Sequence, residues 1–580
     1  MPRAHLLIGP VLRRVAGTQA TIWVETSAPA MVRVSTPDGA GGEAATFTAF
    51  GHHYALVVVT GLEPGRATPY EVFLDGERVW PQPKPAYPPS VIRTRRADDR
   101  DQPVRLVFGS CRETTQRTTA RRLPPDALDA YARRLIAEGG GVGDPTEWPD
   151  LLVLLGDQVY ADEVSPAVRK LLQRRRHRAP QAPADQVVSF DEYTKLYLES
   201  WREPEIRWLL STVPSVMIFD DHEIVDDWNT SAPWRAHARS QPWWTERITS
   251  GLASYWVYQH LGNLSPAELA TDPVYAQVVA AADATAVLRE FGERVDREAA
   301  DHDAALGAGR AAPDPGGRYR WSYALDLGRT RLVMLDNRCG RVLDRRHRAM
   351  LSPADWDWFL DQARGDYDHL VVGSSLPWLL APTIHHLESW NERLADSHRP
   401  RVAELSERLR RAFDLEHWAA FERSFAALAR LFVSLGTGQR RDTADGRRAS
   451  ERPYPPPATI SVLSGDVHHS YLARARFPEG MTTPVHQLTC SAFHNQVPGW
   501  MRPLLRIGWW RLPSLVARTL ARLAGVPHPG LSWRKLAGPY FGNAIGTLVH
   551  DGPTAEVVIE GTDADGTLRT VAALPLRTGA

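Results

Sequence analysis

Cysteine is scarce in this 580-residue chain, and long apolar runs are missing. The three cysteines, Cys111, Cys339 and Cys490, are odd in number and far apart, so they do not form a disulfide framework. There is no stretch of about 18 apolar residues, the length that a membrane-spanning helix needs. The apolar core near the N-terminus is too short for a secretory signal. We therefore expect a cytoplasmic protein.

Neither sign of charge is in excess. The chain has 68 basic and 68 acidic residues, so its formal net charge is zero and nothing indicates nucleic-acid binding. Only four of the basic residues are lysine, a bias typical of genome composition. The arginine-rich stretch 171–178 therefore indicates a solvated helix face. A hydrophobic content of 43% is that of a globular protein, and the length predicts two or three folding units.

Residues 1–80 have the pattern of a small β-sandwich. Short alternating runs of β-branched residues are separated by Gly, Pro and Asp, as at 20–28, 30–36 and 53–62. Tyr70 follows a Leu-x-Pro-Gly corner, a setting in which immunoglobulin-like and fibronectin-type sandwiches use a tyrosine to bond back to the backbone.

A larger unit, 103–580, follows a proline-rich linker at 81–102. It contains continuous apolar runs, which are typical of strands buried on both faces of a layered α/β domain. Helical insertions at about 238–305 and 390–435 are placed to form lids or walls over a site, and the chain ends in a helical and hairpin extension. The apolar runs are 104–109, 150–156, 214–220, 330–336, 369–373 and 459–465.

Polar side chains follow nearly every one of these runs. Because ligands bind at the carboxyl ends of strands in an open α/β sheet, we expect the polar groups to meet at one edge. Crowded carboxylates repel one another and lose hydration, so they need cations or strong pairing. Helix caps and turns explain each segment alone but explain the whole set poorly. We therefore predict a site for two or more multivalent ions.

The motifs "GSC", "GDQVYAD", "DDHE…WN", "LDNR" and "SGDVHHS", in this order, resemble those of PhoD-like (alkaline phosphatase D) metallophosphatases. These are relatives of the purple acid and calcineurin-like phosphatases. The resemblance covers essentially the whole chain. It implies an α/β fold of the metallophosphoesterase type, a four-layer α/β/β/α sandwich with helical insertions behind the N-terminal β-sandwich. It also implies Fe3+ with Ca2+, or Zn2+, Mn2+ or Mg2+ as in other members.

The resemblance assigns metal ligands residue by residue. Asp157 would bridge the ions, and Cys111 and Tyr160 would bind Fe3+ through thiolate and phenolate. Asp221 stands where relatives have Asn in a Gly-Asn-His-Glu motif and would face the second ion. The remaining two ligands are Asp466 and His468.

Two residues would act on the substrate. His222 would lie beside the phosphate as proton donor or charge stabiliser, and Arg338 would clamp a phosphate oxygen. We expect Asp162 to cap or orient its loop. Further candidates, beside the substrate or around the ligands, are Asp220, Glu223, Asn229, His385, His386 and His469.

One segment departs from the family pattern. Relatives with two ions place a histidine after the fifth strand, where residues 373–378 read "GSSLPW". The loss of a nitrogen ligand favours oxygen donors and a hard ion such as Ca2+. Residues 374–392 form either a wall of the cleft, with His385, His386 and Trp390 near the substrate, or a packing cluster.

These features together predict metal-dependent hydrolysis of small-molecule phosphate esters, with a metal-activated water attacking phosphorus in line. Ser110 as a covalent nucleophile is disfavoured because no base is placed for it by spacing. Cys111 in that role is disfavoured because it lacks the typical setting of a thiol hydrolase and stands among metal-type ligands. The alternatives are an inactive PhoD-like scaffold protein and a metallohydrolase of a non-phosphate ester. The motifs fit monoesters and diesters alike, and they indicate no oligomeric state.

Residues 499–525 combine five arginines and three tryptophans with no acidic residue. That composition is found in helices that lie at a membrane surface. Two prolines and the general arginine bias favour a helical cap over the cleft, with arginine stems covering apolar surface. We therefore predict the cap in preference to peripheral membrane contact.

Overall fold

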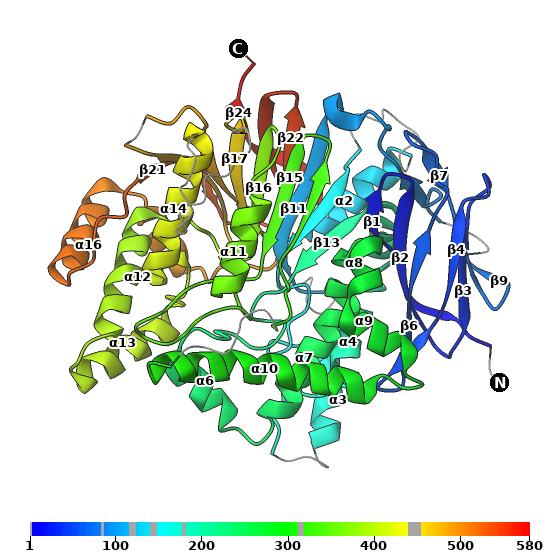
Figure 1. The fold of residues 1–580 in the computed structure, drawn as a ribbon, viewed down its shortest axis with the longest axis horizontal. Coiled ribbons are helices and arrows are strands. Elements are labelled where there is room, and N and C mark those ends of the chain that lie inside the picture. The colour runs from blue at the N-terminus through cyan, green and yellow to red at the C-terminus, as the bar shows by residue number, and fades with distance from the viewer. Residues whose placement is uncertain are drawn as a thin grey trace.

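The computed structural model describes residues 3–82, 86–114, 123–139, 148–176, 181–310, 318–438, 454–478 and 480–579 (Figure 1). Three residues of the predicted linker and the end of the stretch 171–178 lie outside these ranges.

The N-terminal unit consists of two four-stranded antiparallel sheets that share one core. Alternate residues of each strand point into that core, as Ile22 and Val24 do, because successive side chains of a strand lie on opposite faces. One sheet contains β1 (Leu6–Ala16), β2 (Gln19–Thr26), β6 (His52–Val59) and β5 (Phe47–Ala49); the other contains β4 (Gly41–Ala45), β3 (Met31–Ser35), β8 (Glu71–Leu74) and β9 (Glu77–Trp80). Within the predicted linker, β10 (Val91–Arg93) pairs with β7 (Ala67–Pro69).

The larger unit contains two seven-stranded sheets. In the first, the order is β13 (Ser215–Ile218), β12 (Leu151–Leu155), β11 (Val104–Arg112), β22 (Ala544–Asp551), β23 (Thr554–Thr562) and β24 (Leu568–Arg577), and β20 (Ser491–His494) also pairs with β11. In the second, the order is β14 (Tyr323–Leu327), β15 (Thr330–Leu335), β16 (His369–Ser374), β17 (Thr459–Ser464), β19 (Val485–Thr489), β18 (Ser470–Arg476) and β21 (Ser532–Tyr540).

The six apolar runs are parallel strands, three in each sheet. Their composition follows from burial on both faces. In β12, Leu151, Val153 and Leu155 join a core that also contains side chains of the second sheet, whereas Leu152 and Leu154 join a core with helices. The α/β class with an N-terminal unit of paired strands is therefore confirmed.

Helices cover the sheets (Figure 1). At the start of α11, the hydroxyl of Ser352 accepts a hydrogen bond from the backbone N–H of Asp355 and caps the helix. Both predicted insertions are helical. The described α-helices are α2 (Ala127–Ala137), α3 (Pro166–Arg176), α4 (Phe190–Trp201), α5 (Pro204–Thr212), α6 (Ala232–Arg239), α7 (Trp244–Tyr255), α8 (Pro266–Thr271), α9 (Pro273–Ala280), α10 (Thr285–Gly307), α11 (Pro353–Gln362), α12 (Pro382–Ala395), α13 (Pro400–Ala412), α14 (Glu422–Thr437), α15 (Met501–Ile507) and α16 (Arg511–Leu523).

The N-terminal sandwich is joined to the larger unit by a shared apolar core and by buried polar contacts. Ile8, Trp23 and Tyr54 belong to the same buried cluster as the helices around α4 and α7. The fully buried Arg13 donates to four acceptors in the larger unit, among them the carbonyls of Ser215 (3.1 Å), Tyr258 (3.0 Å) and Gln259 (2.7 Å).

Tyr70 makes the tyrosine-to-backbone bond that its corner predicts, but with another unit. Its hydroxyl donates to the carbonyl of Ser211 in α5, at 2.6 Å. The acceptor lies 141 residues further along the chain. The residue therefore fastens the sandwich to the larger unit.

His52 links the two units electrostatically. Its ring lies between Glu25, 3.2 Å from Nδ1, and Asp191 of α4, 3.3 Å from Nε2. Burial lowers the pKa of His52, but the hydrogen bonds to Asp191 and Glu25 outweigh this effect and raise the pKa to about 9.

The His52→Gln variant tests this link. A raised pKa in the folded state means that the charged ring stabilises the fold fully below pH 6.5, and that this stability is lost as the pH rises through about 9. We expect the substitution to lower the melting temperature at pH 6.5, because the free energy of unfolding falls by an amount on the order of 1 kcal/mol. Above pH 9 we expect little effect. Melting curves of both proteins across this range measure it. The exposed His5→Gln variant is the control, and an equal loss at both ends of the range would contradict the assignment.

Candidate metal centre

The carboxyl ends of four parallel strands bring the predicted ligands together. Cys111 is the second-last residue of β11, and Asp157 follows β12. Asp221 follows β13, and Asp466 and His468 follow β17 of the second sheet. Both sheets therefore contribute to one edge, as the sequence predicts.

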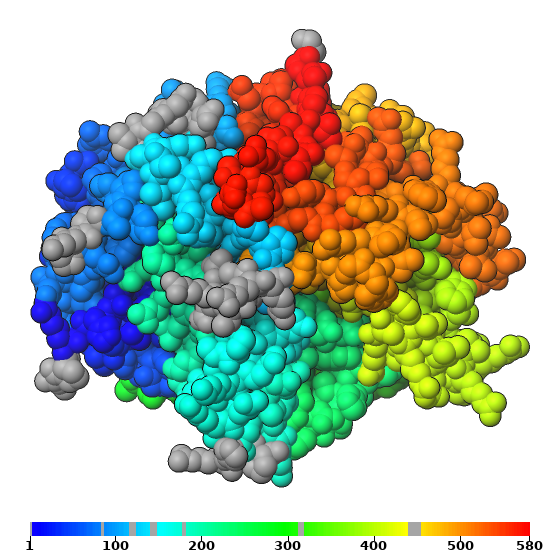
Figure 2. Space-filling model, turned by 180° about the vertical axis from the view of Figure 1, so that it is seen from behind, coloured from blue at the N-terminus to red at the C-terminus, as the bar shows by residue number. Residues whose placement is uncertain are grey.

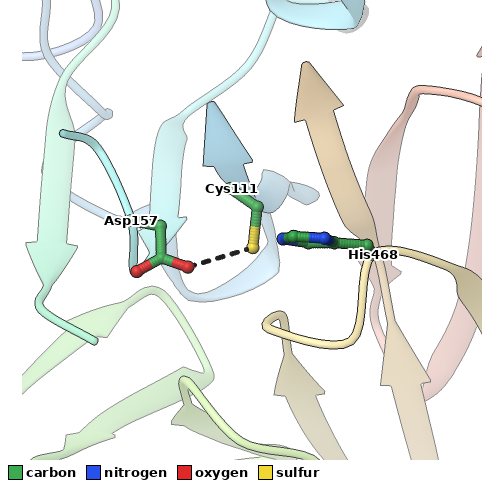
Figure 3. A group of neighbouring side chains, drawn as sticks. All are labelled: Cys111, Asp157 and His468. Atoms are coloured by element: carbon green, nitrogen blue, oxygen red, sulfur yellow. Dashed lines mark hydrogen bonds between the residues drawn. The ribbon is translucent and has the colours of Figure 1, made fainter. Parts of the chain in front are cut away.

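Cys111, Asp157 and His468 form a first group (Figure 3). One potential ligand atom of each residue lies within 4.8 Å of the others. The Cys111 thiol lies 3.4 Å from Asp157 Oδ2. Tyr160 belongs to the same small buried cluster as Cys111, and its hydroxyl accepts a hydrogen bond from Asn495 at 2.9 Å.

Two further groups share residues with the first. Asp157, Asp221 and His222 form one, and Asp220, Asp221 and Asp466 form the other, with potential ligand atoms again within 4.8 Å. Because Asp157 and Asp221 each belong to two groups, the three groups are contiguous. A bridging position for Asp157 is geometrically available.

Four of the predicted ligands have left-handed backbone conformations, which cost free energy in non-glycine residues. The φ angles are 57° at Cys111, 52° at Asp157, 68° at Asp466 and 49° at His468. Strain of this kind is concentrated at functional sites, where the surrounding structure enforces it. Each turn aims a side chain across the sheet edge.

Glu223 holds the loops after β12 and β13 through hydrogen bonds to their backbone. Its carboxylate accepts hydrogen bonds from the backbone N–H groups of Asp157 (3.1 Å), Gln158 (2.8 Å) and Asp220 (2.8 Å), and from Gln259 Nε2 (3.0 Å). All of its contacts hold backbone or a neutral amide. The residue therefore positions the ends of β12 and β13 relative to each other.

Arg338 is fully buried, and its guanidinium is surrounded by carboxylates. It donates to Asp220 and to Glu416, and its Nη2 lies 3.2 Å from Asp221 Oδ1 and 3.6 Å from Asp466 Oδ1. Asn229 supports it by donating to its backbone carbonyl at 3.2 Å. The sequence predicts Arg338 at this edge but does not indicate that its donors face protein carboxylates.

His222 is held by Asp162, whose Oδ1 lies 2.8 Å from His222 Nδ1. Asp162 also accepts the backbone N–H of Asp226 at 2.6 Å. Burial lowers the pKa of His222, but Asp162, Asp221 and Asp157 outweigh burial and raise the pKa well above its ordinary value. Asp162 thus orients both the imidazole and its loop.

His417 and Glu388 reach the centre from the predicted insertion at 390–435 and from α12, and the sequence did not indicate them. His417 lies 3.0 Å from Asp466 through Nε2 and 2.8 Å from Glu388 through Nδ1. Burial raises the pKa of Asp466, but the hydrogen bond and charge of His417 outweigh it and bring the pKa to about 2. The one sequence signal that could have indicated His417 is the pair Glu416-His417, which stands between two segments with a helical pattern.

A fourth acidic group, Asp226, Asp227 and Asp414, lies beside the centre. Burial raises the pKa of Asp227 to about 10, with the neighbouring carboxylates adding to the effect. Asp226 and Asp414 are exposed. The cluster of carboxyl groups therefore extends from the centre to the protein surface.

Three predicted histidines lie in packing contacts. His385 on α12 is buried against Phe425 and Trp533, with ring centroids 4.6 and 4.8 Å away, and His386 is buried beside it. His469 donates from Nδ1 to the carbonyl of Val467 at 2.7 Å and stacks on Tyr471. For residues 374–392, the contacts of His385 and His386 are those expected of a packing cluster.

The donor set fits multivalent cations. Burial raises the pKa of Cys111, Asp157 and Tyr160 well above their ordinary values, so their anionic forms need a cation close by. Asp157 Oδ1 is buried and has no hydrogen-bond partner among the described residues, and the same holds for Asp220 Oδ2. Thiolate, phenolate and imidazole around Cys111 suit a transition metal, whereas the carboxylates around Asp221 suit a hard ion.

Comparison with known proteins adds a family and a fold. Residues 144–278 match the PhoD-like phosphatase family, and residues 3–92 match a domain of unknown function, DUF7800. A solved structure described as "Structure of PhoD" is similar with a TM-score of 0.55 and 11% identity, covering 98% of this chain and 92% of that chain. No curated protein matches. The resemblance to PhoD-like phosphatases is thereby confirmed.

The Cys111→Ala variant tests the ligand set. We expect it to lose most of the transition metal that co-purifies with the wild-type protein, because the remaining donors of the first group are a carboxylate and an imidazole. Metal content per chain by inductively coupled plasma mass spectrometry measures the loss. The matched control is Cys339→Ala, a buried thiol outside the three groups. Equal metal content in both variants would remove Cys111 from the site.

Proposed function

With the PhoD-like resemblance as premise, we propose that this chain hydrolyses small-molecule phosphate esters at the metal centre. The observation that carries the proposal is the convergence of Cys111, Asp157, Asp221 and His468 at one edge of two sheets. Such an edge is where open α/β folds bind ligands. The crowded anionic donors of these residues would hold cations, and cations bind phosphoryl oxygens.

The residues divide into two binding positions. Cys111, Asp157, Tyr160 and His468 would hold Fe3+ or another transition metal, and Asp157, Asp221 and Asp466 would hold Ca2+ or another divalent ion. Bound ions supply Lewis acidity, which polarises the phosphoryl group and lowers the pKa of a water molecule. No protein nucleophile is needed for attack in line with the leaving group.

His222 is the residue placed to handle a proton. Asp162 accepts from Nδ1, which leaves Nε2 on the side of the ring that faces away from Asp162. The side chain is 15% exposed, so a substrate can reach it. We assign it to protonate the leaving oxygen or to stabilise the charge that develops there.

Arg338 has a role in addition to the phosphate clamp that the resemblance implies. Its guanidinium pairs with Asp220 and Glu416 and lies close to Asp221 and Asp466, while its own side chain is fully buried. We propose that it positions these carboxylates and reduces their repulsion. Its Nη2 makes no hydrogen bond among the described residues, which leaves this group as the one that would donate to a phosphate oxygen.

Chelation tests the proposed activity. We expect the wild-type protein to hydrolyse bis-(p-nitrophenyl) phosphate or p-nitrophenyl phosphate, to lose the activity on chelation, and to regain it when Ca2+ is restored. The two rates side by side assign the diester or monoester preference. Absence of turnover of both esters at full metal content would overturn the proposal and favour a scaffold role.

The His222→Ala variant tests the proton-handling role. We expect kcat to fall by about 10²- to 10⁴-fold, the usual contribution of a general acid or base. Metal content should stay at the wild-type level, because His222 is not assigned as a ligand. His237→Ala, on the exposed face of α6, is the control. A variant that loses metal along with activity would make His222 a ligand instead.

A further inference from the structure

Residues 499–525, which we call the basic hairpin, form α15 and α16 at the edge of the molecule opposite the N-terminal sandwich (Figures 1 and 2). α16 packs against α12 through Ala517 and Ala521, its two buried residues. α15 has no buried residue. Small side chains thus face the protein, and the large ones are left outside.

The outer face of the hairpin is apolar. Leu512, Leu515, Val516 and Leu523 follow one another at helical spacing, and Leu523 is 81% exposed. This arrangement is the reverse of that in an ordinary surface helix, whose large apolar residues face the core. Eight of the fourteen exposed large apolar side chains in the described part of the chain belong to the hairpin: Trp500, Leu504, Trp510, Leu512, Leu515, Val516, Leu520 and Leu523.

The charge of the hairpin has one sign. It carries Arg502, Arg506, Arg511, Arg518 and Arg522 and no acidic residue. None of the five has an ion pair with a carboxylate in the described ranges. On α16, Arg511, Arg518 and Arg522 lie along one flank of the apolar face, as their spacing of seven and four residues requires. An apolar face beside unpaired arginines is complementary to the acyl chains and anionic headgroups of a lipid surface.

A second copy of the chain fits this face less well. Pairing two hairpins would bring their arginines together with no carboxylate on either hairpin to balance them. Trp500 and Trp510, exposed at the ends of the helices, are residues that prefer the boundary between apolar and aqueous phases. Among the described residues, no helix has the length and hydropathy needed to cross a bilayer.

We propose that the basic hairpin docks the protein peripherally on anionic phospholipid bilayers, with the leucine face of α16 inserted at the headgroup boundary and the arginines on lipid phosphates. For this segment, the proposal departs from the cap that its composition predicts. The proposal stands independently of the proposed phosphatase activity.

The docking surface is connected to the metal centre by short contacts. The guanidinium of Arg506 lies 5.0 Å from the ring centroid of Phe541, and that ring lies 5.7 Å from His469. On the other side, α12 packs on α16 and carries Glu388, which binds His417. Docking would hold the loop after β17 close to the lipid surface.

Vesicle co-sedimentation with the full chain tests the proposal. We expect binding to vesicles of phosphatidylcholine with phosphatidylserine, little binding to phosphatidylcholine alone, and a decrease with rising salt. The double variant Leu515→Asp/Leu523→Asp should bind at least about tenfold more weakly, because it places charge in the inserted face. The double variant Arg518→Gln/Arg522→Gln should lose most of the preference for the anionic lipid.

The matched control is Leu405→Asp, an exposed leucine on α13 that is 59% exposed and outside the hairpin. It should bind vesicles as the wild type does. Equal binding by the wild type and the Leu515→Asp/Leu523→Asp variant would overturn the proposal. Absence of vesicle binding by the wild type would also overturn it. In that case, a dimer in size-exclusion chromatography that the Leu515→Asp/Leu523→Asp variant abolishes would show that the face pairs with a second copy of the chain instead. Hydrolysis of a soluble ester should be unchanged in all hairpin variants.

Discussion

The repulsion among buried carboxylates is the constraint on which the site depends. Asp157, Asp220, Asp221 and Asp466 lie within one small volume, and Arg338 is the buried cation that pairs with or approaches three of them. The cations beside them, Arg338, His222 and His417, also pair with Glu416, Asp162 and Glu388, and Asp157 Oδ1 and Asp220 Oδ2 lack hydrogen-bond partners among the described residues. The fold concentrates anionic donors beyond what its own cations balance, and this excess makes the edge a candidate site for multivalent ions.

Backbone geometry sets the direction in which each predicted ligand points. Parallel strands deliver the loops to the edge, but left-handed residues at Cys111, Asp157, Asp466 and His468 turn the side chains inward. These conformations cost free energy, and Glu223 helps to maintain two of the loops by binding three backbone N–H groups. Backbone conformation and hydrogen bonds therefore hold the predicted ligands in place.

The sequence predicts the six parallel strands and most of the cluster because these depend on local pattern: an apolar run, then a polar turn. His417 and Glu388 escape prediction because their helical surroundings carry no such pattern and their contact with Asp466 is made only in the tertiary structure. The pairing of Arg338 with protein carboxylates escapes for the same reason. For His385 and His386 the sequence leaves a substrate contact and a packing cluster open, and the structure shows packing contacts of both rings. The orientation of α16 could not be inferred either, because its sequence is compatible with an apolar face that packs on the protein and with one that points outward.

The interface between the N-terminal sandwich and the larger unit has a consequence for how the two parts evolve. Arg13 donates to carbonyls of the larger unit, Tyr70 bonds to Ser211, and Ile8 and Trp23 complete an apolar core that neither part closes alone. A gene shortened at the linker would encode a unit with part of that core open to water. The two parts are therefore expected to be retained together through evolution, and to change by compensating substitutions across their boundary instead of by exchange of modules.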